Sequence, residues 1–365
     1  MLIQYFPPFV IAFLVSVVIT PLITYLAKRY RVLDIPNDPR KIHHKPIPLA
    51  GGMAVFLSFA FTTILYVFFL DTELFGNGYI HDRQIIGILI AGVLLIIGGV
   101  LDDKYHLSWK KQILFALLAS FIILGFEIGI STITNPFGGY LYLNQVTLTV
   151  FRVGASVFTI VLLADIFTFL WLMGMMYTTK LLDGIDGLVT GITVIASLFL
   201  FFVSLKSDLM QYDTALISLI LCGATLGFLV FNWHPAKIFL GEGGALFCGF
   251  MLGVISVIAG GKISTALLVM GIPILDVVWI IFRRWIVENK SPFRSPDKKH
   301  LHFRLIDAGL SQRKVALLYY FFALAFGASV FFIQGKQKII ALLILVMVMV
   351  IMALLLVFKY NKKGN

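Results

Sequence analysis

Charged residues are scarce in this chain of 365 residues: Asp, Glu, Lys and Arg make up 13% of it, about half the share of a soluble domain. A large soluble helical core would need polar helix faces, and runs such as 339–358 have none. The two cysteines, Cys222 and Cys248, both lie in apolar runs, which argues against a disulfide framework or a metal site and indicates helix packing. The first eight residues carry no basic stretch and no cleavage pattern, so we expect the first apolar run to be a retained span.

Long apolar runs are what the chain has in abundance, since 60% of its residues are hydrophobic. About 20 apolar helical residues cross a hydrocarbon core. We therefore predict an all-α polytopic integral membrane protein with about eleven transmembrane helices. The predicted spans are 8–27, 50–70, 85–101, 110–130, 157–178, 187–205, 213–231, 244–261, 263–282, 314–334 and 338–358.

One interruption separates the fourth and fifth predicted spans. Residues 131–156 contain Asn135-Pro136-Phe137-Gly138-Gly139 and then alternate polar with apolar residues, which predicts a short external hairpin or amphipathic strand pair. Asp165 makes 157–178 the weakest of the predicted spans, and we expect that carboxylate near the outer end. No internal repeat or low-complexity tract is visible, so residues 1–365 are expected to form a single membrane domain.

The basic residues set the expected orientation. With the segment 28–45 inside, 23 of the 29 Lys and Arg residues lie in inside segments and 6 lie outside. This bias predicts an external N-terminus and a cytoplasmic C-terminus in the cell's inner or plasma membrane. A basic inner face attracts anionic lipids and anionic substrates alike.

Two acidic motifs fall on the inner side. Asp102-Asp103 ends the third span, and two adjacent carboxylates gain from a divalent cation such as Mg²⁺. Asp183-Gly184-Ile185-Asp186-Gly187 follows the fifth span, where glycines allow close backbone approach to a ligand. The plainer interpretations are a polar helix end and a glycine-rich helix–helix turn.

A third motif runs from Asn232 through Phe239 to the glycine-flanked Glu242. A carboxylate at a helix start can ligate a metal, and backbone N–H groups there can face phosphate. The Gly-Lys-Ser/Thr ending of a P-loop is absent.

Histidines and basic residues supply the remaining candidates. His300, His302 and Arg304 suit phosphate binding or protonation, whereas a zinc site would need a further ligand nearby. Lys45 lies in the proline-rich loop 40–52, which can equally be a simple positive-inside loop. Asp276 lies within a predicted span, where a charge costs about 2.5–3.5 kcal/mol at the bilayer centre, so we expect it to pair with a basic loop residue.

Acidic residues and basic phosphate clamps at one membrane face favour phosphoryl transfer, in which positioning and charge neutralisation provide most of the rate. The membrane location implies that at least one substrate is a lipid phosphate. A transporter is the alternative from another class, but transport sites lie near the bilayer midplane and these carboxylates lie at inner ends.

Taken together, the motifs resemble those of the polyprenyl-phosphate N-acetylhexosamine-1-phosphate transferases, relatives of the phospho-MurNAc-pentapeptide translocase. The likeness covers the His-x-Lys-Pro-x-Pro loop at 43–48, the paired Asp at 102–103 and the Asp-Gly-x-Asp-Gly at 183–187. It continues in the Phe-x-Gly-acid-x-Gly at 239–244, the Pro-Ile-x-Asp at 273–276 and the histidine motif at 300–303. The lead-in to His300 resembles the HexNAc-1-phosphate branch more than the peptidoglycan branch.

Three positions depart from the family pattern. Lys180 stands where the family has Asn, Glu242 where it has Asp, and Phe303 where it has His. Glutamate can still ligate a metal, whereas a lysine ammonium cannot but can neutralise pyrophosphate. The departures either retune substrate choice or abolish activity, and a catalytically inactive relative that binds lipid or nucleotide stays among the alternatives.

The resemblance implies transfer of a HexNAc-1-phosphate, GlcNAc-1-phosphate first, from a UDP-sugar to undecaprenyl or another polyprenyl phosphate, with release of UMP. It implies Mg²⁺, with Mn²⁺ as a substitute, and a role in cell-wall, teichoic-acid or lipopolysaccharide synthesis. A homodimer is compatible with it, and nucleic acid is not expected as a partner. The implied catalytic residues are Asp102, Asp103, His300 and His302; the metal ligands Asp102, Asp183, Asp186 and Glu242; and the substrate-binding residues Lys45, Lys180, Asp186, Asn232, Phe239 and Arg304.

Overall fold

The structure is a computed structural model that describes residues 2–36, 43, 45–70, 74–75, 80–135, 139–153, 156–206, 210–259, 263–287, 289, 300–333 and 336–363. It is predominantly helical. The α-helices are α1 (Phe6–Arg29), α2 (Gly51–Ile64), α3 (Asp82–Tyr105), α4 (Trp109–Gly125), α5 (Leu162–Leu182), α6 (Leu188–Lys206), α7 (Tyr212–Asn232), α8 (Gly241–Ile258), α9 (Ile263–Val269), α10 (Gly271–Phe282), α11 (Leu301–Asp307), α12 (Gln312–Ser329) and α13 (Lys336–Lys363). A 3₁₀ turn (Leu2–Tyr5) precedes α1, and π-helical turns (Leu65–Phe69 and Arg283–Val287) extend α2 and α10.

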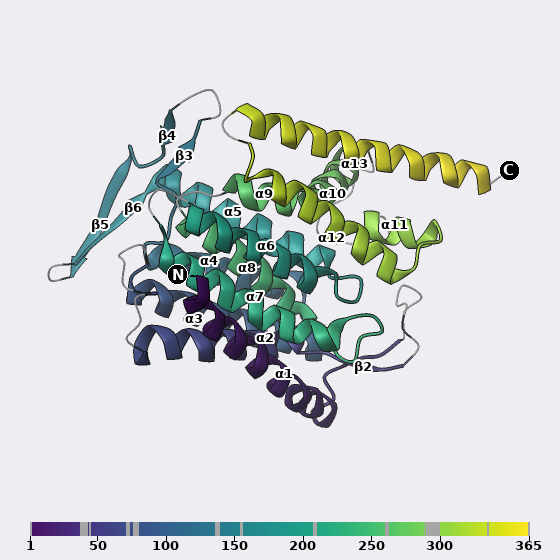
Figure 1. The fold of residues 1–365 in the computed structure, drawn as a ribbon, viewed down its shortest axis with the longest axis horizontal. Helices are drawn as coiled ribbons and strands as arrows, with labels where there is room; N and C mark the ends of the chain where they lie inside the picture. Colours follow the sequence, from purple (N-terminus) through teal and green to yellow (C-terminus); the bar gives the residue numbers. More distant parts are fainter. Residues whose placement is uncertain are drawn as a thin grey trace.

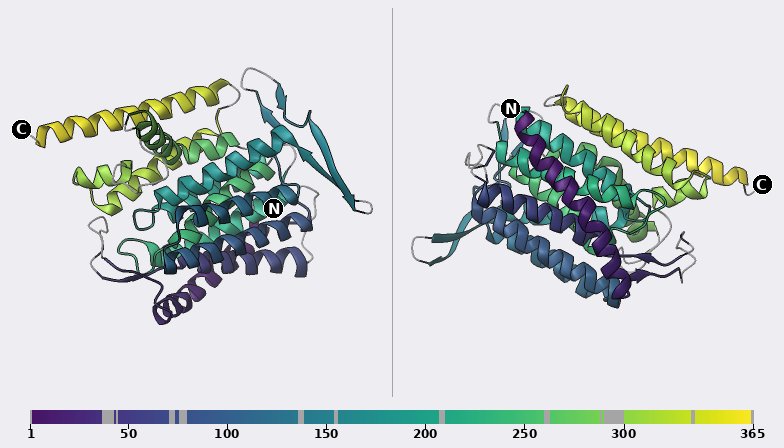
Figure 2. Two further views of the ribbon diagram at one scale, coloured as in Figure 1. Left: turned by 180° about the vertical axis from the view of Figure 1, so that it is seen from behind. Right: turned by 60° about the horizontal axis from the view of Figure 1, so that its bottom comes forward.

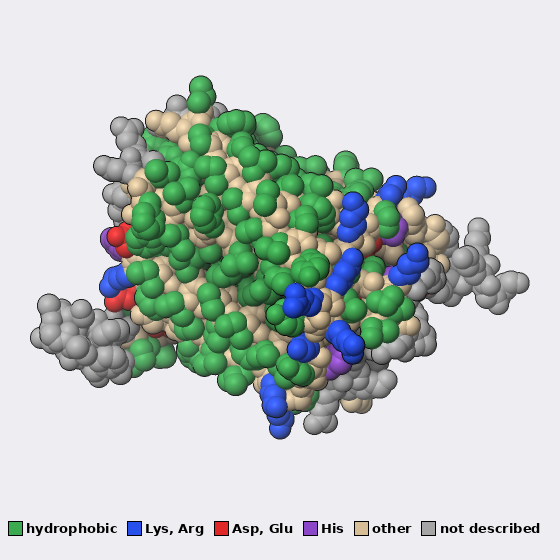
Figure 3. All heavy atoms as spheres, turned by 90° about the horizontal axis from the view of Figure 1, so that it is seen from below, with side chains coloured by type: hydrophobic (Ala, Val, Ile, Leu, Met, Phe, Trp, Pro, Cys, Tyr) green, Lys and Arg blue, Asp and Glu red, His purple; other side chains and the backbone are tan. Residues whose placement is uncertain are grey.

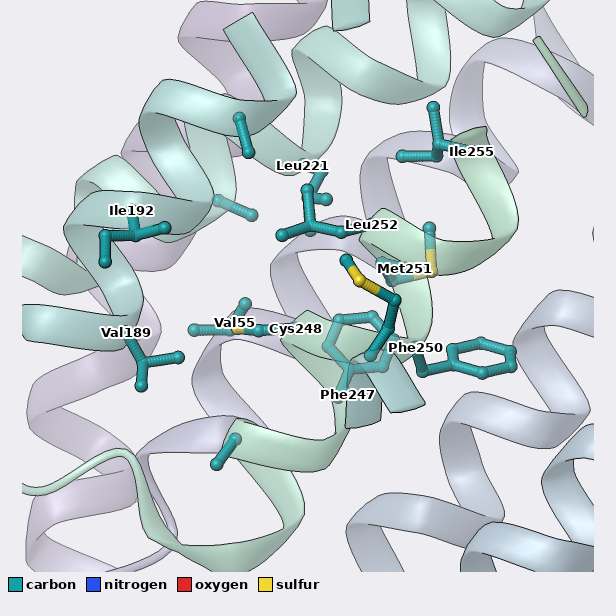
Figure 4. Close-up of a cluster of buried hydrophobic side chains, with 14 of the residues drawn as sticks. Val55, Val189, Ile192, Leu221, Phe247, Cys248, Phe250, Met251, Leu252 and Ile255 are labelled. Atoms are coloured by element: carbon teal, nitrogen blue, oxygen red, sulfur yellow. The ribbon is translucent and has the colours of Figure 1, made fainter. Parts of the chain in front are cut away.

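The helices form a bundle in which α2 to α8 run roughly alongside one another, with α1 on one side and α13 on the opposite side (Figures 1 and 2). Helix α8 lies at the centre, packed against α2, α3, α5 and α6. Figure 4 shows its apolar side chains in one buried cluster with Val55 of α2, Val189 of α6 and Leu221 of α7. Cys222 and Cys248 are free and buried in α7 and α8.

Two glycine pairs bring the start of α8 against its neighbours. A Cβ on Gly52 would lie 2.2 Å from the Cα of Gly244, and one on Gly99 would lie 2.0 Å from the backbone nitrogen of Gly243. Small residues at helix interfaces permit such backbone contact in membranes. These contacts fix the ends of α2 and α3 beside the start of α8, where three of the sequence motifs lie.

Among the described residues, seven helices are long and apolar enough to cross a membrane, namely α1, α2 with its π-helical turn, α3, α5, α6, α7 and α8, and the bent pair α9–α10 makes an eighth if it is one span. Helices α4, α12 and α13 occupy three further predicted ranges. The chain is therefore a polytopic membrane protein, while the count of eleven and the orientation remain predictions.

The surface agrees with this assignment. Helix α1 exposes Leu14, Val18 and Leu22, which are 52%, 73% and 56% accessible. Figure 3 shows an apolar face with Lys and Arg side chains gathered at one end. An apolar belt between polar ends is the arrangement a bilayer requires.

The prediction of an all-α chain with one short hairpin was incomplete. Two antiparallel ribbons project between α4 and α5 (Figure 1), formed by β3 (Thr132–Thr134) with β4 (Tyr140–Tyr142) and by β5 (Thr147–Val153) with β6 (Ser156–Val161). A small ribbon also joins β1 (Leu33–Asp34) to β2 (Ile47–Pro48). Because residues 156–161 pair with β5, the span predicted to start at 157 begins instead at Leu162.

A second correction concerns the predicted span 263–282, which is two helices. Helices α9 and α10 meet at Met270 with a bend of 80°. Gly271 and Pro273 follow the break. Proline is tolerated in the first turn of a helix, because backbone N–H groups there have no acceptor within the helix and the N–H that proline lacks is not needed. The bend carries Asp276 of α10 toward the start of α11.

Candidate functional site

The loop before α2 and the loop before α8 are joined by backbone hydrogen bonds. The Phe239 amide donates to the Pro48 carbonyl at 2.8 Å, and the amides of Gly51 and Gly52 donate to the carbonyls of Phe239 and Leu240 at 3.0 and 2.7 Å. The Phe239 ring meets His43 edge-to-face, with ring centroids 5.3 Å apart. The proline loop and the glycine-flanked acidic motif are thus one structural unit.

Asp103 contacts the N-terminus of α8. Its Oδ1 accepts a hydrogen bond from the Glu242 amide at 3.2 Å, and the positive dipole end of a helix favours such a carboxylate. Gly241 has φ +76°, and a Cβ there would lie 2.5 Å from Asp103 Oδ2. The Oδ2 atom is buried and has no hydrogen-bond partner. Asp103 therefore offers an unsatisfied acceptor to a proton, a cation or a ligand.

Asp102 is held by the turn between α3 and α4. Its Oδ1 accepts from the Leu107 amide at 2.7 Å and from Gln112 Nε2 at 3.0 Å. Gln112 Oε1 in turn accepts from Lys180 Nζ at 2.9 Å. Lys180 also forms an ion pair with Glu242. A continuous polar chain therefore links Asp102 on α3 to Glu242 on α8.

The loop 183–187 is anchored on the loop 232–238. Asp186 Oδ2 accepts from the Ala236 amide at 3.0 Å and lies 2.7 Å from His234 Nδ1. Asn232 Oδ1 accepts from the Gly187 amide at 3.1 Å and the Thr190 hydroxyl at 3.0 Å, while its Nδ2 donates to the Ile238 carbonyl at 3.0 Å. Asn232 thus connects the two loops.

Asp183 is the carboxylate of this loop with the most perturbed ionisation. Burial, then the charges of Glu242 and Asp186, raise the pKa of Asp183 to about 8. A carboxyl group with this pKa is largely protonated at neutral pH until an opposite charge arrives. Asp183 therefore suits a position that ionises when a cation binds.

The histidine motif meets the acidic loop at Gly184. A Cβ there would lie 2.6 Å from His302 Nε2 and 2.8 Å from Phe303 Cζ. Both ring nitrogens of His302 are buried and lack a partner. Burial, with His300 nearby, lowers the pKa of His302 to about 3, so the ring is neutral at physiological pH and can contribute hydrogen bonds but no charge.

Asp276 contacts the first residue of α11 and the residue before it. Its Oδ2 lies 2.9 Å from His300 Nδ1, and its Oδ1 accepts from the Leu301 amide at 2.9 Å. The His300 and His302 rings stack with centroids 5.5 Å apart. The expected pairing of Asp276 with a loop residue is confirmed, and its described partner is His300.

Two further predicted residues are at least partly exposed. Lys45 is exposed, and Arg304 on α11 is half-buried. Arg40, Lys41, His44 and the stretch 290–299, which includes Asp297, Lys298 and Lys299, lie outside the described residues.

Three residues of the site escaped the sequence analysis. Gln112 bridges Asp102 and Lys180, the Tyr320 hydroxyl donates to the Gly187 carbonyl, and Arg313 Nε donates to the His234 carbonyl at 2.9 Å. Each lies in or beside a helix with an ordinary sequence pattern, so no local signal marks them.

The grouping of the acidic side chains limits how they could hold a metal ion. Within the described part of the chain, no three His, Cys, Asp or Glu side chains are arranged to hold one ion together. Mg²⁺ is commonly held by one or two carboxylates together with substrate phosphates and water. The unsatisfied Oδ2 of Asp103 and the neighbouring Glu242 fit a cation shared with a substrate, and not a cage made wholly of protein.

Comparison with known proteins agrees with these motifs. The sequence profile of glycosyl transferase family 4 matches residues 85–260. The chain is 29% identical to a probable undecaprenyl-phosphate N-acetylglucosaminyl 1-phosphate transferase of Bacillus subtilis, covering 92% of this chain and 87% of that protein. It is 31% identical to the decaprenyl-phosphate N-acetylglucosaminephosphotransferase of Mycolicibacterium smegmatis, covering 86% and 79%.

A phospho-N-acetylmuramoyl-pentapeptide-transferase of Anoxybacillus flavithermus is 27% identical, covering 89% of this chain and 96% of that protein. The similarity to all three extends well beyond the matched profile. With the motifs gathered around the start of α8, these findings show that the chain belongs to glycosyl transferase family 4, alongside the polyprenyl-phosphate N-acetylglucosamine-1-phosphate transferases.

Proposed function

We propose that this protein transfers GlcNAc-1-phosphate, or a closely related HexNAc-1-phosphate, from a UDP-sugar to a polyprenyl phosphate. The observation that carries the proposal is the contact at Gly184, where the loop of Asp183 and Asp186 meets His302. Acidic and imidazole groups at one place suit a pyrophosphate-bearing donor and a phosphate acceptor. The names of the relatives support the same pair of substrates.

In the proposed reaction, an oxygen of the polyprenyl phosphate attacks the sugar-linked β-phosphorus of the donor. The bond from that phosphorus to the bridging oxygen breaks, and UMP leaves with the bridging oxygen. Asp103, whose Oδ2 is unsatisfied, takes the proton if the acceptor arrives protonated. The product is polyprenyl-diphospho-HexNAc, which stays in the membrane.

Glu242, with help from Asp102, Asp183 or Asp186, is proposed to hold the divalent cation together with substrate phosphates. Mg²⁺, or Mn²⁺ in its place, would supply Lewis-acid stabilisation of phosphoryl oxygens and a template for the two substrates. His300 and Arg304 are proposed to bind phosphate, and Phe239 the uracil.

The site is proposed to face the cytoplasm, because most basic residues fall on the side that holds the motifs. The product would then serve the synthesis of a cell-envelope polysaccharide.

The test is a transfer assay with the purified full chain in nanodiscs, Mg²⁺, undecaprenyl phosphate and a panel of labelled UDP-sugars. We expect UMP release and lipid-linked label, strongest with UDP-GlcNAc. Transfer only from UDP-MurNAc-pentapeptide would instead assign the peptidoglycan reaction of the Anoxybacillus relative. If a folded sample, checked by circular dichroism, transfers no sugar phosphate, the enzyme proposal is wrong.

A further inference from the structure

The two departures from the family motif that carry charge, Lys180 and Glu242, contact each other. The Lys180 ammonium forms an ion pair with Glu242 Oε1, and the two side chains are only 16% and 19% accessible. We infer that Lys180 is a tethered cation that neutralises Glu242 until a divalent cation displaces it. The inference deepens the proposed function, since it concerns a cation bound at the same site.

The surroundings of the ammonium support this role. Besides the ion pair, Nζ donates to Gln112 Oε1 at 2.9 Å and lies 5.4 Å from the centre of the Tyr177 ring. Gln112 Nε2 in turn donates a hydrogen bond to Asp102 Oδ1 at 3.0 Å. One lysine on α5 is therefore connected to carboxylates on both α3 and α8.

The Lys180 ammonium opposes the binding of a metal ion at Glu242. An ammonium has three donors and no lone pair, so Lys180 occupies Glu242 without being able to ligate anything. A divalent cation at Glu242 would lie within a few ångströms of this positive charge unless the lysine moves. At that distance the repulsion weakens cation binding by about tenfold or more, even with strong solvent screening.

The displaced ammonium has an obvious new partner. Lysine is a compact point charge on a flexible stem and binds phosphate readily. When the metal takes Glu242, Lys180 is released toward the pyrophosphate of the donor. Cation and donor therefore favour each other's binding, and the acidic cluster is not left uncompensated when both are absent.

The main experiment titrates Mn²⁺ into the full chain in nanodiscs and follows free Mn²⁺ by electron paramagnetic resonance. Lys180→Met keeps most of the stem and removes the charge, and we expect it to bind Mn²⁺ about tenfold more tightly than the wild type. Glu242→Gln should bind more weakly, and Lys180→Met should have little effect in the Glu242→Gln background. Unchanged or weaker Mn²⁺ binding by Lys180→Met would overturn the inference.

Lys110→Met is the matched control. Lys110 is exposed at the start of α4, and its ammonium lies over the Trp109 ring, 5.8 Å from the ring centre. Removing this charge should leave Mn²⁺ affinity within about twofold, because exposed charges are screened by solvent and salt.

A second measurement needs no variant and so does not depend on variant folding. Acylation of lysines in the wild-type chain is followed by mass spectrometry with and without saturating Mn²⁺. Displacement from Glu242 should raise the acylation rate of Lys180 at least twofold, while the exposed Lys314 should be unchanged. A Lys180 rate that is unchanged or lower contradicts displacement.

These readouts are independent of sugar transfer. If Mn²⁺ binding and acylation respond as expected but no UDP-sugar is turned over, the proposed function fails and the tethered-cation inference holds. If transfer occurs but Lys180→Met does not tighten Mn²⁺ binding, the inference fails and the function holds.

Discussion

Asp276 and His300 are joined across 24 residues of sequence by a contact of 2.9 Å between Oδ2 and Nδ1. An ionised carboxylate only accepts hydrogen bonds, so His300 donates from Nδ1 and keeps Nε2 as the free nitrogen when neutral. The other oxygen of Asp276 accepts from the Leu301 amide. A carboxylate on the bent helix α10 thus sets both the ring orientation of His300 and the start of α11.

Asp276→Asn should separate these two effects. The Asn oxygen can still accept from Leu301, but the amide nitrogen facing His300 is a donor, so the preferred tautomer of His300 is reversed. We expect the rate of sugar-phosphate transfer to fall by about 10- to 100-fold, the usual cost of losing a group that orients an imidazole. Melting temperature and the pH profile of kcat are measured beside the rate.

Asp165→Asn is the control for this change. Asp165 lies in the first turn of α5, where its Oδ2 accepts from the Val161 amide at 2.9 Å, outside the candidate site. This variant should transfer at the wild-type rate. If Asp276→Asn also keeps the wild-type rate and pH profile, Asp276 does not position His300 for the reaction.

Gly184→Ala tests the contact on which the proposed function depends. The new methyl group would lie 2.6 Å from His302 Nε2 and 2.8 Å from Phe303 Cζ, so the His302 and Phe303 rings must move away from the acidic loop. A displacement of about 1 Å in an active site can cost about 100-fold in rate, and we expect a loss of that order. The measurement is kcat at saturating substrates.

Gly174→Ala provides the comparison, because an added Cβ on this glycine of α5 meets nothing within 4 Å. Alanine in place of a helical glycine should leave activity unchanged and raise stability slightly. Equal transfer rates for the two alanine variants would show that the contact at Gly184 is not part of the site.

Much of this site could be predicted from the sequence. Asp102-Asp103 and the Asp183–Gly187 loop break otherwise apolar runs, and a charge beside a membrane span needs a reason. These signals are local, so a single sequence displays them. The close packing of Gly99 against Gly243 is a separate finding of the structure, and the approach of the 183–187 glycines to a ligand stays a prediction.

The tertiary pairings could not be predicted in the same way. In the sequence, Lys180 and Glu242 are two separate departures from the family pattern, because nothing in a sequence shows that α5 and α8 place them in contact. Gln112 has no motif of its own, and its role depends on both neighbours being present. The break at Met270 cannot be predicted from hydropathy, because the run stays apolar on both sides of it and hydropathy carries no information on the direction of a helix axis.

The pH dependence of the free energy of unfolding should show that His302 is buried in its neutral form. Its pKa of about 3 in the folded protein lies below the ordinary value of 6.5, so the unfolded chain binds a proton that the folded chain does not. The contribution of neutral His302 to the free energy of unfolding is therefore fully present above about pH 6.5 and is lost as the pH falls toward 3. Between pH 7 and pH 5 this group alone should remove about 2 kcal/mol of stability.

Thermal unfolding of His302→Asn at the two pH values isolates this contribution. The variant should lose less stability than the wild type on going to pH 5. His106→Asn is the control, because His106 is exposed and its φ of 49° is one that Asn tolerates. If both variants follow the wild-type pH dependence, His302 is not held neutral by burial.

The paired carboxylates should differ in their roles, and Asp102→Asn and Asp103→Asn form a matched pair that tests this. Asp102 fixes the turn to α4 by accepting from Leu107 and Gln112 at one oxygen, Oδ1, and the oxygen of Asn can accept the same two hydrogen bonds, so Asp102→Asn should keep its melting temperature. Asp103 keeps one unsatisfied oxygen, and a group that accepts a proton contributes about 10²- to 10⁴-fold to a rate. We therefore expect Asp103→Asn to lose kcat by that factor with its fold intact, measured as UMP release at saturating substrates. The reverse pattern, in which Asp102→Asn is inactive but stable and Asp103→Asn is active, would assign the proton to Asp102.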